Sequence, residues 1–185
     1  MNRVWELSSG AIALVAVTMV ALAVVSAPAH ASVGVFHDPT GDVRSHVDVT
    51  RVSVQNAPRR LILITRYVNL SRRVEQFVGY GIDVGGPHPG PDFSVGAGFE
   101  GANGEWNVFR ARHWHAYGAP LDCKSDLVTR FARDFTRFTL SRGCLGGSRS
   151  TVRISMDAGE NRADGSVVRD YLPAYRQLTG WIPIG

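Results

Sequence analysis

The sequence has 185 residues, a formal net charge of +4 and a hydrophobic content of 44%. Its nineteen arginines and one lysine are spread along the chain, and no basic run is longer than two residues. Because a nucleic-acid-binding surface needs basic residues clustered on one face, this distribution excludes nucleic acid as an expected partner. The length corresponds to one domain with a substantial core.

An apolar segment at residues 11–25 follows a weakly basic start at Arg3 and precedes the A-x-A sequence Ala29-His30-Ala31. This order is typical of a secretory signal peptide over residues 1–31. The apolar run is shorter than the roughly 20 residues that span a membrane, and an uncleaved N-terminal anchor is the alternative. We expect residues 32–185 to form one domain that is secreted or associated with the cell wall, without a membrane span after cleavage.

Short segments with alternating apolar and polar residues recur after the signal peptide, separated by glycine, proline, asparagine and aspartate. This pattern predicts an all-β fold, an antiparallel β-sandwich of the jelly-roll or immunoglobulin-like kind. The expected strands cover residues 47–54, 61–68, 77–84, 93–99, 106–115, 127–132, 135–141 and 151–156. A change of phase in the first strand predicts a β-bulge near Thr50 and Arg51. The apolar tail is expected to pack back on the sandwich.

Two cysteines in an exported domain most often form a disulfide, although free thiols or a metal site are alternatives. Residues 127–132 and 135–141 predict a hairpin that turns at Arg133 and Asp134. If the turn is symmetric, opposed residues have numbers that sum to 267, and Cys123 faces Cys144. A disulfide there would stabilise the fold by about 3 kcal/mol in the chain-entropy model.

Three aspartates, Asp38, Asp42 and Asp48, follow the spacing D-x3-D-x5-D around a proline and a glycine. Hard oxygen ligands on a turn are what Ca²⁺ requires, so this loop is a candidate calcium site. The alternative is that the aspartates cap turns through hydrogen bonds to the nearby backbone. No other cofactor is expected.

Two histidines, His113 and His115, flank a tryptophan within an expected strand. The period of two residues would place both imidazoles on one face, within reach of a transition metal. Exposed histidines without a metal are the alternative. The sequence has no G-x-S-x-G motif and no cysteine free of the expected disulfide, so no catalytic residue is assigned.

Four aromatic residues are candidates for a platform on which sugar rings could stack: Tyr80, Trp106, Trp114 and Tyr117. Aromatic side chains with one polar atom suit such a role, but they also fill protein cores. Both interpretations are open for each of the four residues.

The D-P-T-G-D sequence at residues 38–42 is followed by D-V-T-R-V-S-V at residues 48–54. This opening resembles DOMON-like and family 9-like carbohydrate-binding modules, and the resemblance implies an antiparallel sandwich. The chain is also similar to small secreted actinobacterial proteins of unknown function. That similarity includes the C-L-G segment at Cys144 and the D-x-x-P…W ending formed by Asp170, Pro173 and Trp181.

Together, the fold class and the lack of catalytic residues indicate a non-catalytic binding module for a glycan or a protein at the cell envelope. The alternatives are a secreted metal-assisted hydrolase that uses His113 and His115, and a purely structural envelope protein. The same fold class hosts all three functions. The sequence does not predict an oligomeric state.

Overall fold

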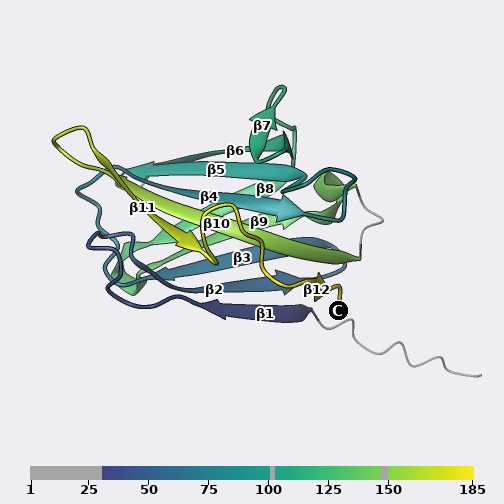
Figure 1. The fold of residues 1–185 in the computed structure, drawn as a ribbon, viewed down its shortest axis with the longest axis horizontal. Helices are drawn as coiled ribbons and strands as arrows, with labels where there is room; N and C mark the ends of the chain where they lie inside the picture. Colours follow the sequence, from purple (N-terminus) through teal and green to yellow (C-terminus); the bar gives the residue numbers. More distant parts are fainter. Residues whose placement is uncertain (1–30, 101–102, 147–149) are drawn as a thin grey trace, which may run out of the picture.

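The computed structural model describes residues 31–100, 103–146 and 150–185. The predicted signal peptide therefore lies outside the described residues, apart from its last position. Strands dominate the described chain, which has no α-helix and only two short 3₁₀ turns, η1 (Phe131–Arg133) and η2 (Arg142–Leu145). Two antiparallel sheets pack face to face (Figure 1). The prediction of an antiparallel β-sandwich is confirmed. None of the described segments is a helix long and apolar enough to cross a membrane.

The first sheet has five strands and contains the predicted β-bulge. Across the sheet the strands are β1 (Ser32–His37), β2 (Val49–Asn56), β3 (Arg60–Tyr67), β9 (Phe135–Ser141) and β8 (Ser125–Arg130). The register between β2 and β3 shifts between Val49 and Arg51. Because of this extra residue, Val49 and Val52 both point into the core, although their spacing is odd.

The second sheet supplies the other layer and is built mainly from the C-terminal half. Its path is β11 (Val167–Leu172), β10 (Thr151–Asn161), β4 (Gln76–Asp83), β5 (Phe93–Glu100), β6 (Asn103–Arg112) and β7 (His115–Tyr117), and β12 (Ile182–Pro183) also pairs with β10. The strand predicted over residues 151–156 continues to Asn161. It continues because its backbone pairs with β4 as far as Glu160 and with β11 as far as Asn161, and the Asp157 and Glu160 side chains have polar partners in Arg169 and His46.

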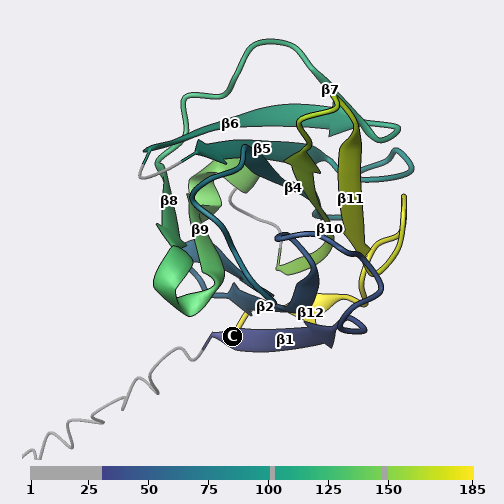
Figure 2. The ribbon, with the colours of Figure 1, turned by 90° about the vertical axis from the view of Figure 1, so that its left-hand side faces the viewer.

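In Figure 2 the two sheets lie one above the other, with β8 below one end of β6 and β12 close to β2. Side-chain hydrogen bonds connect the two sheets at both places. On one edge, the Trp106 indole N–H donates to the Ser125 hydroxyl at 3.0 Å and joins β6 to β8. On the other edge, the Asn56 amide donates to the Ile182 carbonyl at 2.9 Å and joins β2 to β12. The predicted packing of the C-terminal tail is confirmed, because β11 and β12 both pair with β10.

Aromatic and hydroxyl side chains meet between the sheets. The rings of Tyr80 on β4 and Phe138 on β9 stack with centroids 6.3 Å apart. The hydroxyl groups of Tyr80 and Thr65 lie 2.7 Å apart, which satisfies two polar groups that would otherwise be buried without a partner. Burial raises the pKa of the Tyr80 hydroxyl, so this side chain stays neutral in the core.

The predicted disulfide between Cys123 and Cys144 is confirmed, but the predicted hairpin register is wrong. Leu127 pairs with Phe138, not with Leu140. The sequence numbers of opposed residues therefore sum to 265 instead of the predicted 267. The strands are joined by the four residues 131–134, which include η1, instead of a tight turn at 133–134. A shift of two residues keeps every side chain on its predicted face. Cys144 still reaches Cys123 because it lies in η2, beyond the end of β9.

Candidate functional site

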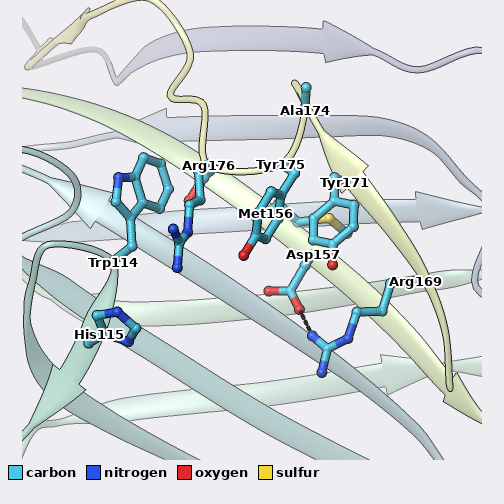
Figure 3. A pocket seen from close by; sticks show the side chains of 10 residues that line it. Trp114, His115, Met156, Asp157, Arg169, Tyr171, Ala174, Tyr175 and Arg176 are labelled. Carbon is cyan, nitrogen blue, oxygen red and sulfur yellow. Dashed lines mark hydrogen bonds and ion pairs between the residues drawn. The ribbon is translucent and has the colours of Figure 1, made fainter.

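An open cleft of about 310 Å³ lies against the outer face of the seven-stranded sheet. The turn before β7 forms one wall, and the segment that follows β11 forms the other (Figure 3). The side chains that line it and could contact a ligand are Trp114, His115, Asp157, Tyr171, Tyr175 and Arg176. They combine aromatic rings with groups that donate and accept hydrogen bonds, which is the usual composition of a site for a small polar ligand.

An ion pair between Asp157 and Arg169 lies on the floor of the cleft, next to Gly79. Asp157 on β10 pairs with Arg169 on β11, with a distance of 2.8 Å between the carboxylate and guanidinium atoms. In the register of the sheet, Asp157 lies opposite Gly79 of β4, and a Cβ at Gly79 would collide with the Asp157 carboxylate. Because Gly79 has no side chain, the Asp157 carboxylate has room to lie against strand β4. Burial raises the pKa of Asp157, and the neighbouring Arg169 acts in the opposite direction.

Two residues that line the cleft have left-handed backbone conformations that L-amino acids rarely adopt. The φ angle is 68° for Trp114 and 55° for Arg176, and neither residue is glycine, asparagine or aspartate. Such conformations cost about 1–3 kcal/mol each and occur preferentially at functional sites. Gly90, in the proline-rich loop before β5, lies directly against the Trp114 indole, where a Cβ would come within 3.0 Å of the ring. The loop therefore supports one wall of the cleft.

Arg176 brings a positive charge into the cleft. Figure 3 shows its guanidinium extending into the cleft, with Trp114 on one side and Tyr175 on the other. The guanidinium carbon lies 5.2 Å from the centre of the Tyr175 ring, and Tyr175 in turn makes an edge contact with Tyr171. Within the described part of the chain, no carboxylate forms an ion pair with Arg176. Its N–H groups are therefore suitably placed to donate hydrogen bonds to a ligand.

The four predicted aromatic residues do not assemble into one platform. Tyr80 is only 2% exposed and belongs to the core, so it is not available to stack on a sugar. Trp106 is half-buried, with its indole N–H bonded to Ser125. Trp114 lines the cleft, and Tyr117 is exposed on β7. The platform fails because β4 places Tyr80 on the inner face of its sheet.

The structure removes the argument for a metal site at the two histidines. The predicted strand over residues 106–115 ends earlier, at Arg112, and His113 lies in a turn with a φ of 52°. His113 and His115 are therefore not two residues apart on one strand. His113 lies near His88, with ring centroids 5.6 Å apart, and His115 lines the cleft. Among the described residues, no group of three or more metal-ligating side chains includes a histidine.

A second cluster of polar residues lies where β1, β2 and β11 approach one another. Carboxylate oxygens of Asp38, Asp42 and Asp170 all lie within 4.8 Å of one another. Asp48 belongs to the same region, because its Oδ2 accepts a hydrogen bond from the Gly41 N–H at 2.8 Å. The three aspartates of the predicted calcium loop thus lie in one region of the fold, and the structure adds Asp170 from a strand more than 120 residues away in the sequence.

The electrostatics of this cluster disfavour ionisation. Burial and the charges of Asp170, Asp42 and Asp48 raise the pKa of Asp38 to about 7. Burial also raises the pKa of Asp48 and of Asp170, against hydrogen bonds from backbone N–H groups that lower them. In the absence of a cation, the cluster therefore holds a proton near neutral pH.

This shift predicts how stability depends on pH in the absence of metal. Between pH 4 and 7 the unfolded chain loses the Asp38 proton and the folded chain keeps it, so stability falls as pH rises. We expect the melting temperature in EDTA to fall across this interval more steeply for the wild type than for Asp38→Asn, whose side chain does not titrate. Melting curves at half-unit steps of pH measure the difference. Parallel curves for the two proteins would contradict the prediction.

Sequence reasoning missed the second wall of the cleft, which Tyr171, Tyr175 and Arg176 form. Residues 167–172 read V-V-R-D-Y-L, which does not alternate between apolar and polar residues, so the local pattern does not predict the strand that carries Arg169 and Tyr171. Nothing in the sequence near residues 167–172 indicates that this strand lies close to Trp114 in the fold. Likewise, Asp170 carries no sign in the sequence that it meets the loop at residues 38–48.

The fold and these two sites define an antiparallel β-sandwich with one disulfide, a cleft on one sheet and a carboxylate cluster at one end. No family model, curated protein or solved structure matches the chain significantly. The resemblance to carbohydrate-binding modules therefore stays a prediction, and a function is inferred from the geometry alone.

Proposed function

We propose that the protein is an exported, non-catalytic binding module that holds a saccharide in the cleft between Trp114 and Arg176. The observation that carries the proposal is the Arg176 guanidinium in an open cleft, where it forms no ion pair with any described residue and lies over the Tyr175 ring, which in turn contacts Tyr171. A pyranose ring has apolar C–H faces and peripheral hydroxyl groups. Aromatic rings suit the faces, and a guanidinium and a carboxylate suit the hydroxyl groups.

The outer face beside the cleft leaves room for a chain longer than one sugar. Asp157 lies opposite Gly79 in the sheet, and Gly79 lies opposite Gly96 of β5. A Cβ at Gly96 or at Gly98 would meet no atom within 4 Å. This open surface on β5 supports an extended glycan more than a compact ligand. Export is supported by the signal-like sequence at residues 1–31 and by the disulfide.

The proposal is tested with a panel of soluble neutral and uronic-acid oligosaccharides, followed by calorimetry on those that bind. Arg176→Ala is expected to weaken binding at least tenfold, because it removes the charge-assisted hydrogen bonds to the ligand. Arg137→Ala removes an exposed arginine on β9, in the other sheet, and is expected to leave the affinity unchanged.

Two outcomes would overturn the proposal. One is that no oligosaccharide of the panel binds at millimolar concentration. The other is that a saccharide binds with the same affinity to the wild type and to Arg176→Ala, which would place its site elsewhere. Selective binding of acidic oligosaccharides would identify Arg176 as the residue that recognises the charge.

A further inference from the structure

We propose that Asp38, Asp42, Asp48 and Asp170 form a calcium site that fastens the loop between β1 and β2 to strand β11. This inference goes beyond the proposed saccharide site and does not depend on it. The two sites use different residues on opposite sides of β11, and calcium binding is measured without any saccharide.

The first argument is the separation of the carboxylates. Oxygens of Asp38, Asp42 and Asp170 lie within 4.8 Å of one another, and Asp170 is only 3% exposed. Like charges at this distance repel strongly where water is partly excluded. None of the ion pairs formed by the described residues involves these aspartates, so no positive side chain in the described part of the chain forms an ion pair that balances them.

The second argument is independent of the clustering and concerns unsatisfied oxygens. Asp48 is 3% exposed, and the bond from Gly41 to its Oδ2 directs the side chain into the loop that carries Asp38 and Asp42. Its Oδ1 is buried and has no hydrogen-bond partner, and the same holds for Oδ2 of Asp38. A buried carboxylate oxygen without a donor is costly. A cation at the cluster would give the Asp38 oxygen a partner, and Asp48 is hydrogen-bonded to the same loop at Gly41.

The donor set selects the metal. All four side chains offer carboxylate oxygen, and a hard divalent cation prefers this ligand to nitrogen or sulfur. Ca²⁺ accepts several carboxylates in an irregular shell, completed by backbone carbonyls or water. Mg²⁺ usually keeps most of its water and takes only one or two carboxylates. Four carboxylates from two separate segments therefore favour Ca²⁺.

The location defines what the ion would do. Asp170 already accepts a hydrogen bond from the Val49 N–H at 2.6 Å, which connects β11 of one sheet to β2 of the other. The loop at residues 38–48 is also held by the His46 imidazole, 2.9 Å from Glu160 on β10. An ion at the aspartates would add a third connection and close this end of the sandwich.

The test is a calorimetric titration of the chelator-treated protein with CaCl₂ at pH 7.5, repeated with MgCl₂. We expect one Ca²⁺ ion per chain, with an affinity at least tenfold higher than for Mg²⁺. An excess of Ca²⁺ should raise the melting temperature by mass action. This titration uses the wild-type protein and needs no variant.

Two variants separate an ion site from a structural role. Asp38→Asn keeps the shape but removes a charge, and it should bind Ca²⁺ at least tenfold more weakly. In EDTA the same variant should melt at the same temperature as the wild type or higher, because it relieves repulsion. A side chain that only supports the fold would lower the melting temperature in both conditions. Asp122→Asn, an exposed aspartate outside the cluster, is the matched control and should change neither value.

The proposal is overturned if 10 mM CaCl₂ produces neither binding heat nor a change in the melting temperature. It is equally overturned if Ca²⁺ binds Asp38→Asn as tightly as it binds the wild type. In either case the clustered carboxylates do not form a calcium site. Loss of calcium binding and loss of saccharide binding are read from separate titrations, so the two proposals fail separately.

Discussion

Replacing Phe138 with alanine is expected to lower the free energy of unfolding by about 3–5 kcal/mol, the range for an aromatic side chain removed from a packed core. Phe138 is fully buried on β9 and stacks on Tyr80, which belongs to the opposite sheet. The substitution therefore leaves a cavity between the two layers, where neighbours on both sheets lose contacts. Urea denaturation followed by tryptophan fluorescence measures the loss.

The matched control is Phe135→Ala, three residues earlier on the same strand. Phe135 is only partly buried, and its ring faces the Arg66 guanidinium at 5.7 Å instead of the core. We expect a loss of no more than about 1 kcal/mol. Equal losses for the two variants would show that Phe138 does not connect the sheets as described.

Replacing both Cys123 and Cys144 with serine is expected to lower the free energy of unfolding by about 3 kcal/mol. The disulfide closes a loop with a sequence separation of 21 residues. It restricts the unfolded chain, so its loss increases the conformational entropy of the unfolded state and favours unfolding. The loss is measured by urea denaturation of the oxidised wild type and the double variant.

Reduction of the wild-type disulfide provides the control for this second variant. The reduced protein and the double variant should have the same denaturation midpoint within error, since neither has the crosslink. A loss below about 1 kcal/mol for both would contradict the entropic argument and would mean that η2 and β8 hold each other without the bond.

Strand β11 relates the two proposed sites. Side chains alternate along a strand, so Arg169 and Tyr171 face the cleft, and Asp170 between them faces the carboxylate cluster. The protein thus uses one short strand to carry residues of both sites. Fastening Asp170 through an ion would also fix the positions of its two neighbours in the cleft.

Much of the fold could be predicted because it depends on patterns among residues that are close in the sequence. The alternation of apolar residues predicts the strands, and the odd spacing from Val49 to Val52 predicts the bulge, since a buried face must stay in phase. The pairing of Cys123 with Cys144 follows because a hairpin brings its two ends together whatever its exact turn. The prediction missed the register by two residues because the turn length depends on the 3₁₀ geometry at residues 131–133.

The sites could be predicted only in part, because they join segments that are distant in the chain. Three aspartates of the loop at residues 38–48 were visible in the sequence, since one loop carries them all. Asp170 was not, because its place beside them depends on how β11 crosses the end of the sandwich. The strand predicted over residues 106–115 ends early for the same kind of reason: a turn at His113 separates the two histidines that one strand would have aligned.

The sequence by itself determined the all-β class, the disulfide and the acidic loop, because each depends on spacing between near neighbours. Only the tertiary structure decided that Asp170 joins the acidic loop and that Trp114 faces Arg176 across a cleft. Contacts of this kind depend on the order of strands in the sheets. That order follows from burying the apolar faces of the whole chain together, which no short segment encodes.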